Sequence, residues 1–406
     1  MKVLEINSAL YGSTGKIALQ IAEVSKRHGH DVRLCVPKGR HNSEIIDDNI
    51  IYFGNRLSED SHLALSRLTG LNGYFSIIAT QKLIKKIDAF NPDIIQLHNL
   101  HNSYINISML FSYIKKKDIP VIWTFHDCWP FTGKCPHFTV VECEKWKTGC
   151  HDCKQYKTYP RAYVDNTRFL WKDKKRMFLG VSNMTIVTPS KWLCGLVKES
   201  FLQQYYVKVI NNGIDLNIFK PTNDEFRKKN HLDNRKIVLG VASVWGKNKG
   251  LDVFYRLANE LPDEYIVVLV GIESNKHSSM PSNIIGINRT DNQEQLADIY
   301  SCADVFVNPT LEDNFPTVNL EALACGTPVI TYDTGGCPES IDVKSGCAIP
   351  RGDYDSLKEA IIHTVDNHVF LKSDCVKKAR EYSAEDKYEE YIKLYENCSR
   401  STKRSI

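Results

Sequence analysis

The fold class is decided by residues 2–36, which read KVLEINSALYGSTGKIALQIAEVSKRHGHDVRLCV. An apolar run at Lys2–Ile6 is followed by an amphipathic stretch at about residues 15–28 and by a second apolar run at Val32–Val36. Strands that alternate with helices of this length form βαβ units, and such units build parallel sheets covered on both faces. The N-terminal part of the chain is therefore predicted to be an α/β domain.

The same alternation continues along most of the chain. Strand-like runs follow at residues 93–97, 121–125 and 185–188, and residues 76–90 carry apolar side chains at helical spacing. The pattern starts again after about residue 205, with apolar runs at residues 207–210, 237–241, 265–270 and 303–307. Two doubly wound α/β domains are predicted, because a single core does not extend over a chain of this length.

The predicted domains are residues 1–205 and 206–385, followed by a C-terminal helix and tail at residues 386–406. Ligands bind sheets of this kind at the carboxyl ends of the strands. If those ends face one another in the two domains, the natural ligand site is the cleft between them.

Composition excludes several classes of protein. Apolar residues make up 42% of the 406 residues and charged residues 25%, as in soluble globular proteins. The net charge is only +4, and no basic run is interleaved with aromatic residues as nucleic-acid binding would require. The chain opens directly on a strand, so we expect a cytoplasmic protein whose thirteen cysteines are reduced.

The densest functional signal is the segment 309–329, which reads PTLEDNFPTVNLEALACGTPV. Asp313 is expected in a loop after the strand that ends at Val307, and Glu321 in the helix that follows. A helix start can bind a diphosphate, and a carboxylate farther along can accept hydrogen bonds from ribose hydroxyls. Taken alone, two acids at this spacing are also typical of a capped, solvated surface helix.

The start of that helix carries the groups expected to contact phosphate. Pro316 is a residue typical of a helix start, and it would place the backbone N–H groups of Thr317 and Val318 at the positive end of the helix dipole.

The whole segment resembles the signature of family 4 retaining glycosyltransferases of the GT-B fold, in which two Rossmann-like domains face each other across a cleft. Further motifs of that family occur in the expected order, at residues 212–215, 249–252, 326–330 and 334–339. The similarity covers nearly the full chain, and it extends to the branch that builds bacterial surface polysaccharides of the colanic acid, capsule and O-antigen types.

The resemblance implies a role for each matching residue. Asp313 would face hydroxyls of the donor sugar, Glu321 would bind the ribose, and Lys249 would neutralise the diphosphate leaving group. The arginine that the family usually has about five residues before this lysine is absent, so Lys247, or Ser243 with backbone amides, would supply the second contact. The predicted catalytic residues are Asp313, His126 and Lys249. The predicted donor-binding residues are Gly12, Gly15, Ser243, Lys247, Lys249, Phe315, Pro316, Thr317, Val318 and Glu321.

The N-terminal domain contributes a glycine turn and three histidines. Residues 8–16 read SALYGSTGK, which fails the P-loop pattern, but Gly12 and Gly15 permit close backbone approach at a helix start. His126 follows an expected strand end and matches a family histidine near the donor sugar. His98 and His101 follow another strand end, and they are predicted at the acceptor; a plain structural role is the alternative for each.

A cysteine-bearing insertion is expected near residues 128–160. Cys150 and Cys153 form a Cys-x2-Cys knuckle, and Cys135 and Cys143 are candidate partners for a structural zinc ion without a catalytic role. Because a second knuckle is missing, ordinary reduced thiols remain the alternative.

The resemblance implies a retaining glycosyltransferase with a UDP- or GDP-linked donor and a glycan or polyprenyl-diphosphate-linked acceptor. No cofactor is expected to be required for catalysis, and peripheral association with the inner face of the cytoplasmic membrane is suggested by the resemblance. Two alternatives stay open: a nucleotide-sugar epimerase of the same fold, and a non-catalytic sugar-binding protein.

Overall fold

The computed structural model describes residues 1–39, 42, 47–273 and 280–403. It divides into two compact units, which are considered separately below. Unit 1 comprises residues Met1–Asn211 and Lys387–Ile406, and unit 2 comprises Asn212–Asp386.

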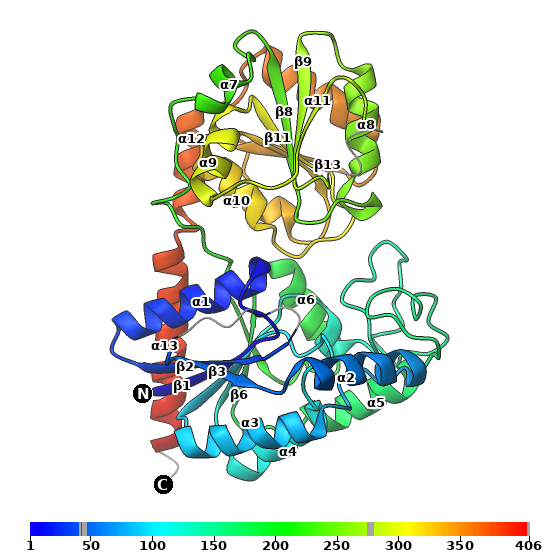
Figure 1. Ribbon diagram of the computed structural model, residues 1–406, viewed down its shortest axis with the longest axis vertical. Helices are drawn as coiled ribbons and strands as arrows, with labels where there is room; N and C mark the ends of the chain where they lie inside the picture. Colours follow the sequence, from blue (N-terminus) through cyan, green and yellow to red (C-terminus); the bar gives the residue numbers. More distant parts are fainter. Residues whose placement is uncertain (40–41, 43–46, 274–279, 404–406) are drawn as a thin grey trace. The chain divides into compact units, whose positions relative to one another are not determined.

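The described part of unit 1 forms a seven-stranded parallel sheet with the strand order β3-β2-β1-β4-β5-β6-β7. Figure 1 shows α1 on one side of these strands and α3 and α4 on the other. The strands are β1 (Lys2–Ile6), β2 (Asp31–Pro37), β3 (Ile50–Phe53), β4 (Ile94–Leu97), β5 (Val121–Thr124), β6 (Met184–Thr188) and β7 (Tyr206–Val209). The helices are α1 (Gly12–Arg27), α2 (Arg56–Thr69), α3 (Ile77–Phe90), α4 (Ile107–Lys117), η1 (Trp129–Phe131), α5 (Thr167–Phe178) and α6 (Lys191–Glu199).

The described part of unit 2 repeats this plan with a six-stranded parallel sheet of order β10-β9-β8-β11-β12-β13. The strands are β8 (Lys236–Val241), β9 (Tyr265–Val270), β10 (Ile284–Ile287), β11 (Val305–Asn308), β12 (Val329–Asp333) and β13 (Gly346–Pro350). The helices are α7 (Glu225–Lys229), η2 (Lys247–Lys249), α8 (Leu251–Glu260), α9 (Gln293–Cys302), α10 (Thr317–Ala324), η4 (Cys337–Ser340), α11 (Tyr354–Asp366) and α12 (Lys372–Arg380). The predicted fold class, two doubly wound α/β domains, is confirmed.

Burial on both faces explains why the central strands are almost continuously apolar. Every residue of β4, β5, β9 and β11 is buried. In unit 1 the core beside β5 is aromatic: the ring centroid of Trp123 lies 5.3 Å from that of Phe111 and 4.9 Å from that of Phe178. Burial of such large side chains is the main force that holds helices against a parallel sheet.

The strand order locates the expected ligand site within each unit. In unit 1 the order reverses between β1 and β4, and in unit 2 it reverses between β8 and β11. At such a switch point the loops leave neighbouring strands in opposite directions and open a crevice. The loops after β1 and β4, and those after β8 and β11, are therefore the places to look for a site.

The end of the first domain and the C-terminal helix differ from the sequence-based expectation. Strand β7 pairs with β6 and so completes the sheet of unit 1 instead of opening the second domain. The last helix, α13 (Ala384–Lys403), belongs to unit 1 from Lys387 onward. It carries tyrosines that contact this unit: the hydroxyl of Tyr388 lies 3.3 Å from Gln20 Oε1, and that of Tyr391 lies 3.2 Å from Thr124 Oγ1.

No helix within the described ranges is both long enough and apolar enough to cross a membrane.

Candidate active site

In unit 2 the loops that follow β8 and β11 are fastened to each other. The carbonyl oxygen of Asn248 accepts hydrogen bonds from Leu311 N at 2.9 Å and from Thr310 Oγ1 at 3.2 Å. A Cβ atom added to Gly250 would come within 2.5 Å of Pro309 Cγ, so only glycine permits this approach. The predicted lysine and acidic loops are thereby held side by side at the switch point.

This fastening brings two predicted catalytic residues into contact. Lys249 Nζ lies 2.7 Å from Asp313 Oδ2, and their side chains are 40% and 21% exposed. Burial alone would lower the pKa of Lys249, but the charge and hydrogen bond of Asp313 outweigh it and raise that pKa. The site therefore presents a reliably charged ammonium group that a solvent-borne anion can reach.

The helix that follows Asp313 begins where the sequence predicted. Pro316 is the N-cap and Thr317 the first residue of α10. The first N–H groups of a helix have no intrahelical acceptor, so those of Thr317 and Val318 are the ones available to an anion. They stand one turn from Asp313, on the same loop-to-helix junction.

The side chain of Phe315 does not lie where its predicted donor-binding role would place it. The ring is only 3% exposed and packs against Tyr382, with the ring centroids 5.5 Å apart. Its carbonyl oxygen accepts a hydrogen bond from Asn212 Nδ2 at 2.9 Å. Phe315 thus anchors the acidic loop to the core of unit 2, and its side chain does not form part of an open donor surface.

Glu321 is far more buried than a surface acid. It is 9% exposed, and Oε2 accepts a hydrogen bond from the hydroxyl of Tyr300 at 2.9 Å. Burial, together with the nearby charge of Glu321, raises the pKa of Tyr300 and keeps this donor protonated. Tyr300 was not predicted as a site residue, because its position on α9 opposite Glu321 exists only in the folded unit.

Asn319 is a second residue that the sequence reasoning missed. It lies on α10 between Thr317 and Glu321 and is fully buried. Asn308 Nδ2 donates to its Oδ1 at 2.8 Å, and its own Nδ2 donates to Ser340 Oγ at 2.9 Å. These bonds fix α10 between the ends of β11 and η4. A polar residue between the apolar Val318 and Leu320 was the available signal.

The two residues proposed as substitutes for the family's arginine both lie after β8. Ser243 is exposed in the loop and Lys247 is exposed in η2. The fold puts them in the same loop as Lys249, and their contact with a phosphate stays a prediction.

In unit 1 the glycine turn connects β1 to α1, at the switch point of that sheet. Gly12 is the first residue of α1 and has φ +72°. A Cβ atom on Gly15 would lie 2.4 Å from the backbone carbon of Leu10, so this helix start packs directly on the loop before it. The contact of this turn with a donor phosphate remains a prediction.

His98 and His126 form a buried chain with Glu5. His98 Nδ1 lies 3.1 Å from His126 Nε2, His98 Nε2 lies 3.2 Å from Glu5 Oε2, and the two rings stack with centroids 5.4 Å apart. Burial lowers the pKa of each histidine to about 3 and raises that of Glu5. The two histidines are therefore uncharged at neutral pH.

The burial of His98 corrects its predicted place at the acceptor. Its side chain is fully enclosed, so it cannot contact an acceptor in this conformation. Instead it supports His126, which is half-buried at the end of β5.

His101 occupies a different setting. Its Nε2 lies 2.8 Å from Asp127 Oδ2, and its Nδ1 lies 3.0 Å from the hydroxyl of Tyr159. Burial would raise the pKa of Asp127, but the adjacent His101 outweighs it and holds that pKa below its usual range. Neither Asp127 nor Tyr159 was predicted as a site residue.

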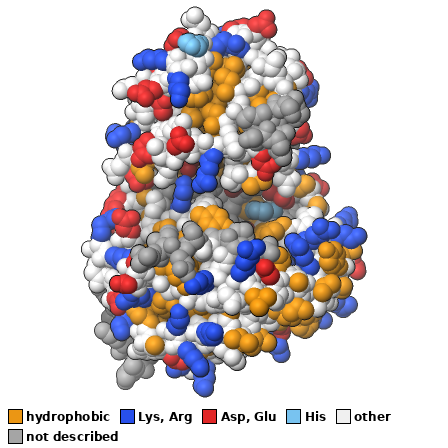
Figure 2. Space-filling view, viewed as in Figure 1, with side chains coloured by type: hydrophobic (Ala, Val, Ile, Leu, Met, Phe, Trp, Pro, Cys, Tyr) orange, Lys and Arg blue, Asp and Glu red, His pale blue; other side chains and the backbone are white. Residues whose placement is uncertain are grey.

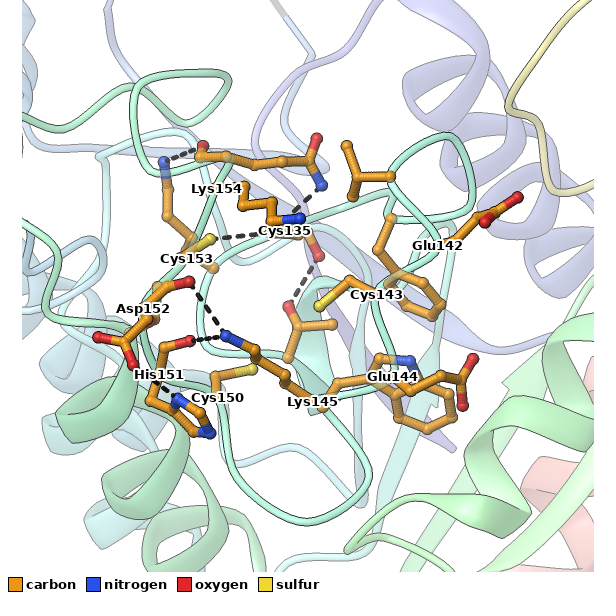
Figure 3. A pocket seen from close by; sticks show the side chains of 17 residues that line it. Cys135, Glu142, Cys143, Glu144, Lys145, Cys150, His151, Asp152, Cys153 and Lys154 are labelled. Carbon is orange, nitrogen blue, oxygen red and sulfur yellow. Dashed lines mark hydrogen bonds and ion pairs between the residues drawn. The ribbon is translucent and has the colours of Figure 1, made fainter.

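The four insertion cysteines line one pocket of about 170 Å³, shown in Figure 3. Cys135 Sγ and Cys153 Sγ are 4.0 Å apart, close to the separation of two sulfurs on one zinc ion, whereas Cys150 Sγ accepts a hydrogen bond from Gly133 N. Within the ranges that the structure covers, no group of three or more His, Cys, Asp or Glu side chains is arranged to hold a metal ion. The predicted set Cys135, Cys143, Cys150 and Cys153 is thus gathered but not assembled into a zinc site.

Family models match both halves of the chain. A model described as Glycosyltransferase Family 4 matches residues 14–218, and one described as Glycosyl transferases group 1 matches residues 235–367.

Individual relatives agree with these matches. A protein of Escherichia coli K12 assigned to colanic acid biosynthesis, glycosyl transferase WcaC, is 23% identical over 98% of this chain and 100% of its own length. The N,N'-diacetylbacillosaminyl-diphospho-undecaprenol alpha-1,3-N-acetylgalactosaminyltransferase of Campylobacter jejuni is 27% identical over 45% of this chain and 52% of its own.

Solved structures share the fold. Sucrose-phosphate synthase from Thermosynechococcus elongatus has a TM-score of 0.72 at 16% identity, with 98% of each chain covered. Anabaena Alr3699/HepE, solved in complex with UDP, has a TM-score of 0.67 at 13% identity, covering 98% of this chain and 100% of that one. Since the family 4 model spans more than half of the residues and both units have the Rossmann-like plan, the chain belongs to glycosyltransferase family 4 and is an enzyme with the GT-B fold.

Proposed function

We propose that this glycosyltransferase transfers a sugar from a UDP- or GDP-linked donor, with retention of anomeric configuration, to a glycan or polyprenyl-diphosphate-linked acceptor in cell-surface polysaccharide synthesis. The observation that carries the proposal is the Lys249–Asp313 pair, 2.7 Å apart beside the N-terminus of α10. The Lys249 ammonium group suits a diphosphate, and the Asp313 carboxylate suits sugar hydroxyls. The start of α10 adds backbone N–H groups as further hydrogen-bond donors. UDP bound to a solved structure of the same fold, and the diphospho-undecaprenol named for the Campylobacter relative, support the choice of donor and acceptor.

The chemistry follows from where charge develops. As the anomeric C–O bond breaks, positive charge grows on the sugar and negative charge on the departing diphosphate. Lys249 and the first N–H groups of α10 stabilise the diphosphate, and fixed groups of this kind supply the largest share of many enzymatic rate enhancements. The donor's phosphate and hydroxyl groups take over the hydrogen bonds that Lys249 and Asp313 make to each other in the described structure.

The acceptor side belongs to unit 1. His126 faces the donor sugar in this proposal, and the Gly12–Gly15 turn approaches the phosphates. The acceptor hydroxyl attacks the anomeric carbon from the face that the leaving group departs, and its proton passes to the departing diphosphate oxygen. The anomeric configuration is thereby preserved without a covalent intermediate. Exclusion of water from the ligand prevents donor hydrolysis.

The direct test is donor binding and transfer. Isothermal titration calorimetry with UDP-glucose, UDP-N-acetylglucosamine, GDP-mannose and GDP-fucose should show binding of at least one, and Lys249→Ala should weaken it. Lys229→Ala, a change at an exposed lysine of α7, should not. Binding of every donor to Lys249→Ala with unchanged affinity would overturn the proposed site.

Product analysis separates the proposal from its alternatives. Mass spectrometry of a reaction with the bound donor and a polyprenyl-diphosphate sugar should show an acceptor one sugar heavier. An epimerase would convert the donor without acceptor, and a non-catalytic binding protein would leave both unchanged.

A further part of the proposal is peripheral association with the membrane that holds such an acceptor. Leu57 and Leu68 of α2 are 74% and 61% exposed, and Phe169 of α5 is 49% exposed. Figure 2 shows hydrophobic side chains beside basic ones over the part of unit 1 that carries α2 and α5. Apolar side chains next to lysine and arginine bind anionic lipid surfaces. Flotation with vesicles containing phosphatidylglycerol should recover the protein, and Leu57→Ser/Leu68→Ser should release it.

A further inference from the structure

One face of the unit 1 sheet carries three polar side chains that are almost completely enclosed. Glu5 of β1 and Gln96 of β4 are register partners on neighbouring strands. Side chains alternate between the two faces of a sheet, so His98, two residues beyond Gln96, lies on the same face. The three residues are 0%, 0% and 2% exposed. Because such groups exchange hydrogen bonds with one another and not with solvent, the direction of each bond can be worked out.

The C-terminal helix fixes the orientation of the Gln96 amide. Tyr395 of α13 is fully buried, and its hydroxyl donates to Gln96 Oε1. Burial raises the pKa of Tyr395 well above its usual range, so the hydroxyl keeps its proton. The other end of the amide, Nε2, lies 3.1 Å from His98 Nε2. An amide nitrogen only donates, and His98 Nε2 must therefore be an acceptor.

Glu5 approaches the same nitrogen as a second donor. Glu5 Oε2 lies 3.2 Å from His98 Nε2, and no hydrogen-bond partner of Oε1 is found among the described residues. A buried carboxylate with an unpaired oxygen is costly, and burial raises the pKa of Glu5 well above its usual range. The neutral acid therefore holds its proton on Oε2, where His98 Nε2 accepts it.

The direction of these bonds continues to His126. An uncharged imidazole that accepts at Nε2 carries its hydrogen on Nδ1. His98 Nδ1 lies 3.1 Å from His126 Nε2, so His98 donates this bond and His126 Nε2 accepts it. Burial keeps His126 uncharged as well. Its own hydrogen is therefore on Nδ1, the ring nitrogen that points away from His98.

We propose that this buried network fixes His126 in its Nδ1–H tautomer, so that His126 donates a hydrogen bond to a hydroxyl oxygen of the donor sugar. The positioning residues are Glu5, Gln96, His98 and Tyr395. The inference rests on the proposed function and deepens it, because it names the atom that contacts the sugar and assigns the C-terminal helix a part in preparing it. A hydrogen-bond donor held in one tautomer needs no rearrangement when the ligand binds.

The tautomer is read directly by NMR. Long-range ¹H–¹⁵N correlation spectra of the full-length protein with ¹⁵N-labelled histidines distinguish a ring nitrogen that carries hydrogen from one that does not. His98→Gln and His126→Gln assign the two sets of signals. The unsubstituted protein should show hydrogen on Nδ1 and a bare Nε2 at both residues.

The C-terminal helix offers a matched control. Tyr391 is 2% exposed, and its hydroxyl lies 3.2 Å from Thr124 Oγ1, outside the network. The double variant Glu5→Met/Tyr395→Phe removes the acid and frees the Gln96 amide to turn over and present Oε1 to His98. Glu5→Met/Tyr391→Phe also removes the acid and one buried hydroxyl of α13, but it leaves the amide fixed.

The two double variants should have similar unfolding temperatures and different histidine spectra. Only Glu5→Met/Tyr395→Phe should populate the Nε2–H tautomer of His126. With the nucleotide sugar that binds in calorimetry, its kcat/KM for transfer should be about three- to tenfold below that of the control, the usual effect of one lost hydrogen bond. Glu5→Gln, whose amide still donates to His98, should keep both the tautomer and the rate. A purely structural role of the network would instead lower the rates of both double variants equally.

Hydrogen on Nε2 of His126 in the unsubstituted protein would overturn the inference, and this result does not depend on how well any variant folds. Equal spectra and equal rates in the two double variants would overturn it as well. The proposed function fails separately. Donor binding that depends on Lys249, with His126 in the Nε2–H form, would remove only the inference. The Nδ1–H form in a protein that neither binds nor transfers a nucleotide sugar would remove the reaction and leave the assigned tautomer in place.

Discussion

The two units place charge at their switch points in opposite ways. In unit 2 the loops after β8 and β11 present a partly exposed ion pair, Lys249 and Asp313. In unit 1 the loops after β4 and β5 carry histidines that burial keeps uncharged, with His98 and His126 linked to Glu5. The same architecture therefore presents an ion pair to solvent in one unit and encloses uncharged histidines in the other.

The largest expected effect tests the charged half of this contrast. Lys249→Ala should lower the rate of sugar transfer by about 10²- to 10³-fold, because it removes the cation nearest the developing negative charge. Initial rates at saturating donor measure it. Lys229→Ala serves as the control, and a rate within a factor of about two of the unsubstituted protein for Lys249→Ala would contradict the assignment.

The next effect concerns the buried acid. Glu321→Ala leaves the Tyr300 hydroxyl without its acceptor inside unit 2, so the free energy of unfolding should fall by roughly 1–3 kcal/mol. Denaturant unfolding measures this change. Tyr300→Phe, which removes the hydroxyl group and keeps the carboxylate, should retain more of the nucleotide-sugar binding, if Glu321 also holds the ribose. Equal donor affinity in Glu321→Ala and in the unsubstituted protein would limit Glu321 to a structural role.

A third comparison is internal to the glycine turn. Gly15→Ala places Cβ 2.4 Å from the backbone of Leu10, which has no room to move, so the free energy of unfolding should fall by about 1–3 kcal/mol. Gly12→Ala meets no atom within 4 Å and bears only the strain of φ +72°, which costs about 1 kcal/mol. Thermal unfolding of the two variants ranks them. The reverse order would show that the turn relaxes at Gly15.

The smallest expected effect tests the uncharged, enclosed histidines of unit 1. The pKa of His98 is lowered to about 3 by burial, so the unfolded chain binds its proton first as the pH falls below the ordinary value of about 6.5. The contribution of His98 to stability is complete above about pH 6.5. It is lost progressively as the pH falls from there toward about 3, the pKa of His98 in the folded protein. The unfolding temperature of His98→Gln should therefore fall less steeply between about pH 7 and about pH 5. An equally steep fall in His98→Gln and in the unsubstituted protein would contradict this account of His98.

Local patterns predicted much of the molecule. The alternation of apolar runs and amphipathic stretches was enough for two doubly wound α/β domains, since period and length are properties of the chain alone. The acidic segment with its helix start was predicted at the right element: Thr317 begins α10 directly after Pro316. The ordered family motifs pointed to the same family that the comparisons show.

The burial of individual side chains and the residues that they contact could not be predicted from the sequence in the same way. His98 and His101 follow the same strand, three residues apart, yet one is enclosed against Glu5 and the other contacts Tyr159 on a distant loop. Both were predicted at the acceptor, because a strand end predicts proximity to a site but not the direction of each side chain. The ring of Phe315 likewise turned into the core of unit 2.

The sequence by itself therefore determined the fold class, the family and the loops that carry the chemistry, because these depend on periodicity and on residue types at short spacing. Only the tertiary structure decided that Lys249 meets Asp313, that Tyr300 holds Glu321, and that Tyr159 joins His101 and Asp127. Each of these pairs brings together segments from 21 to 64 residues apart. Packing of whole elements fixes such contacts, and no local pattern along the chain encodes the distance between them.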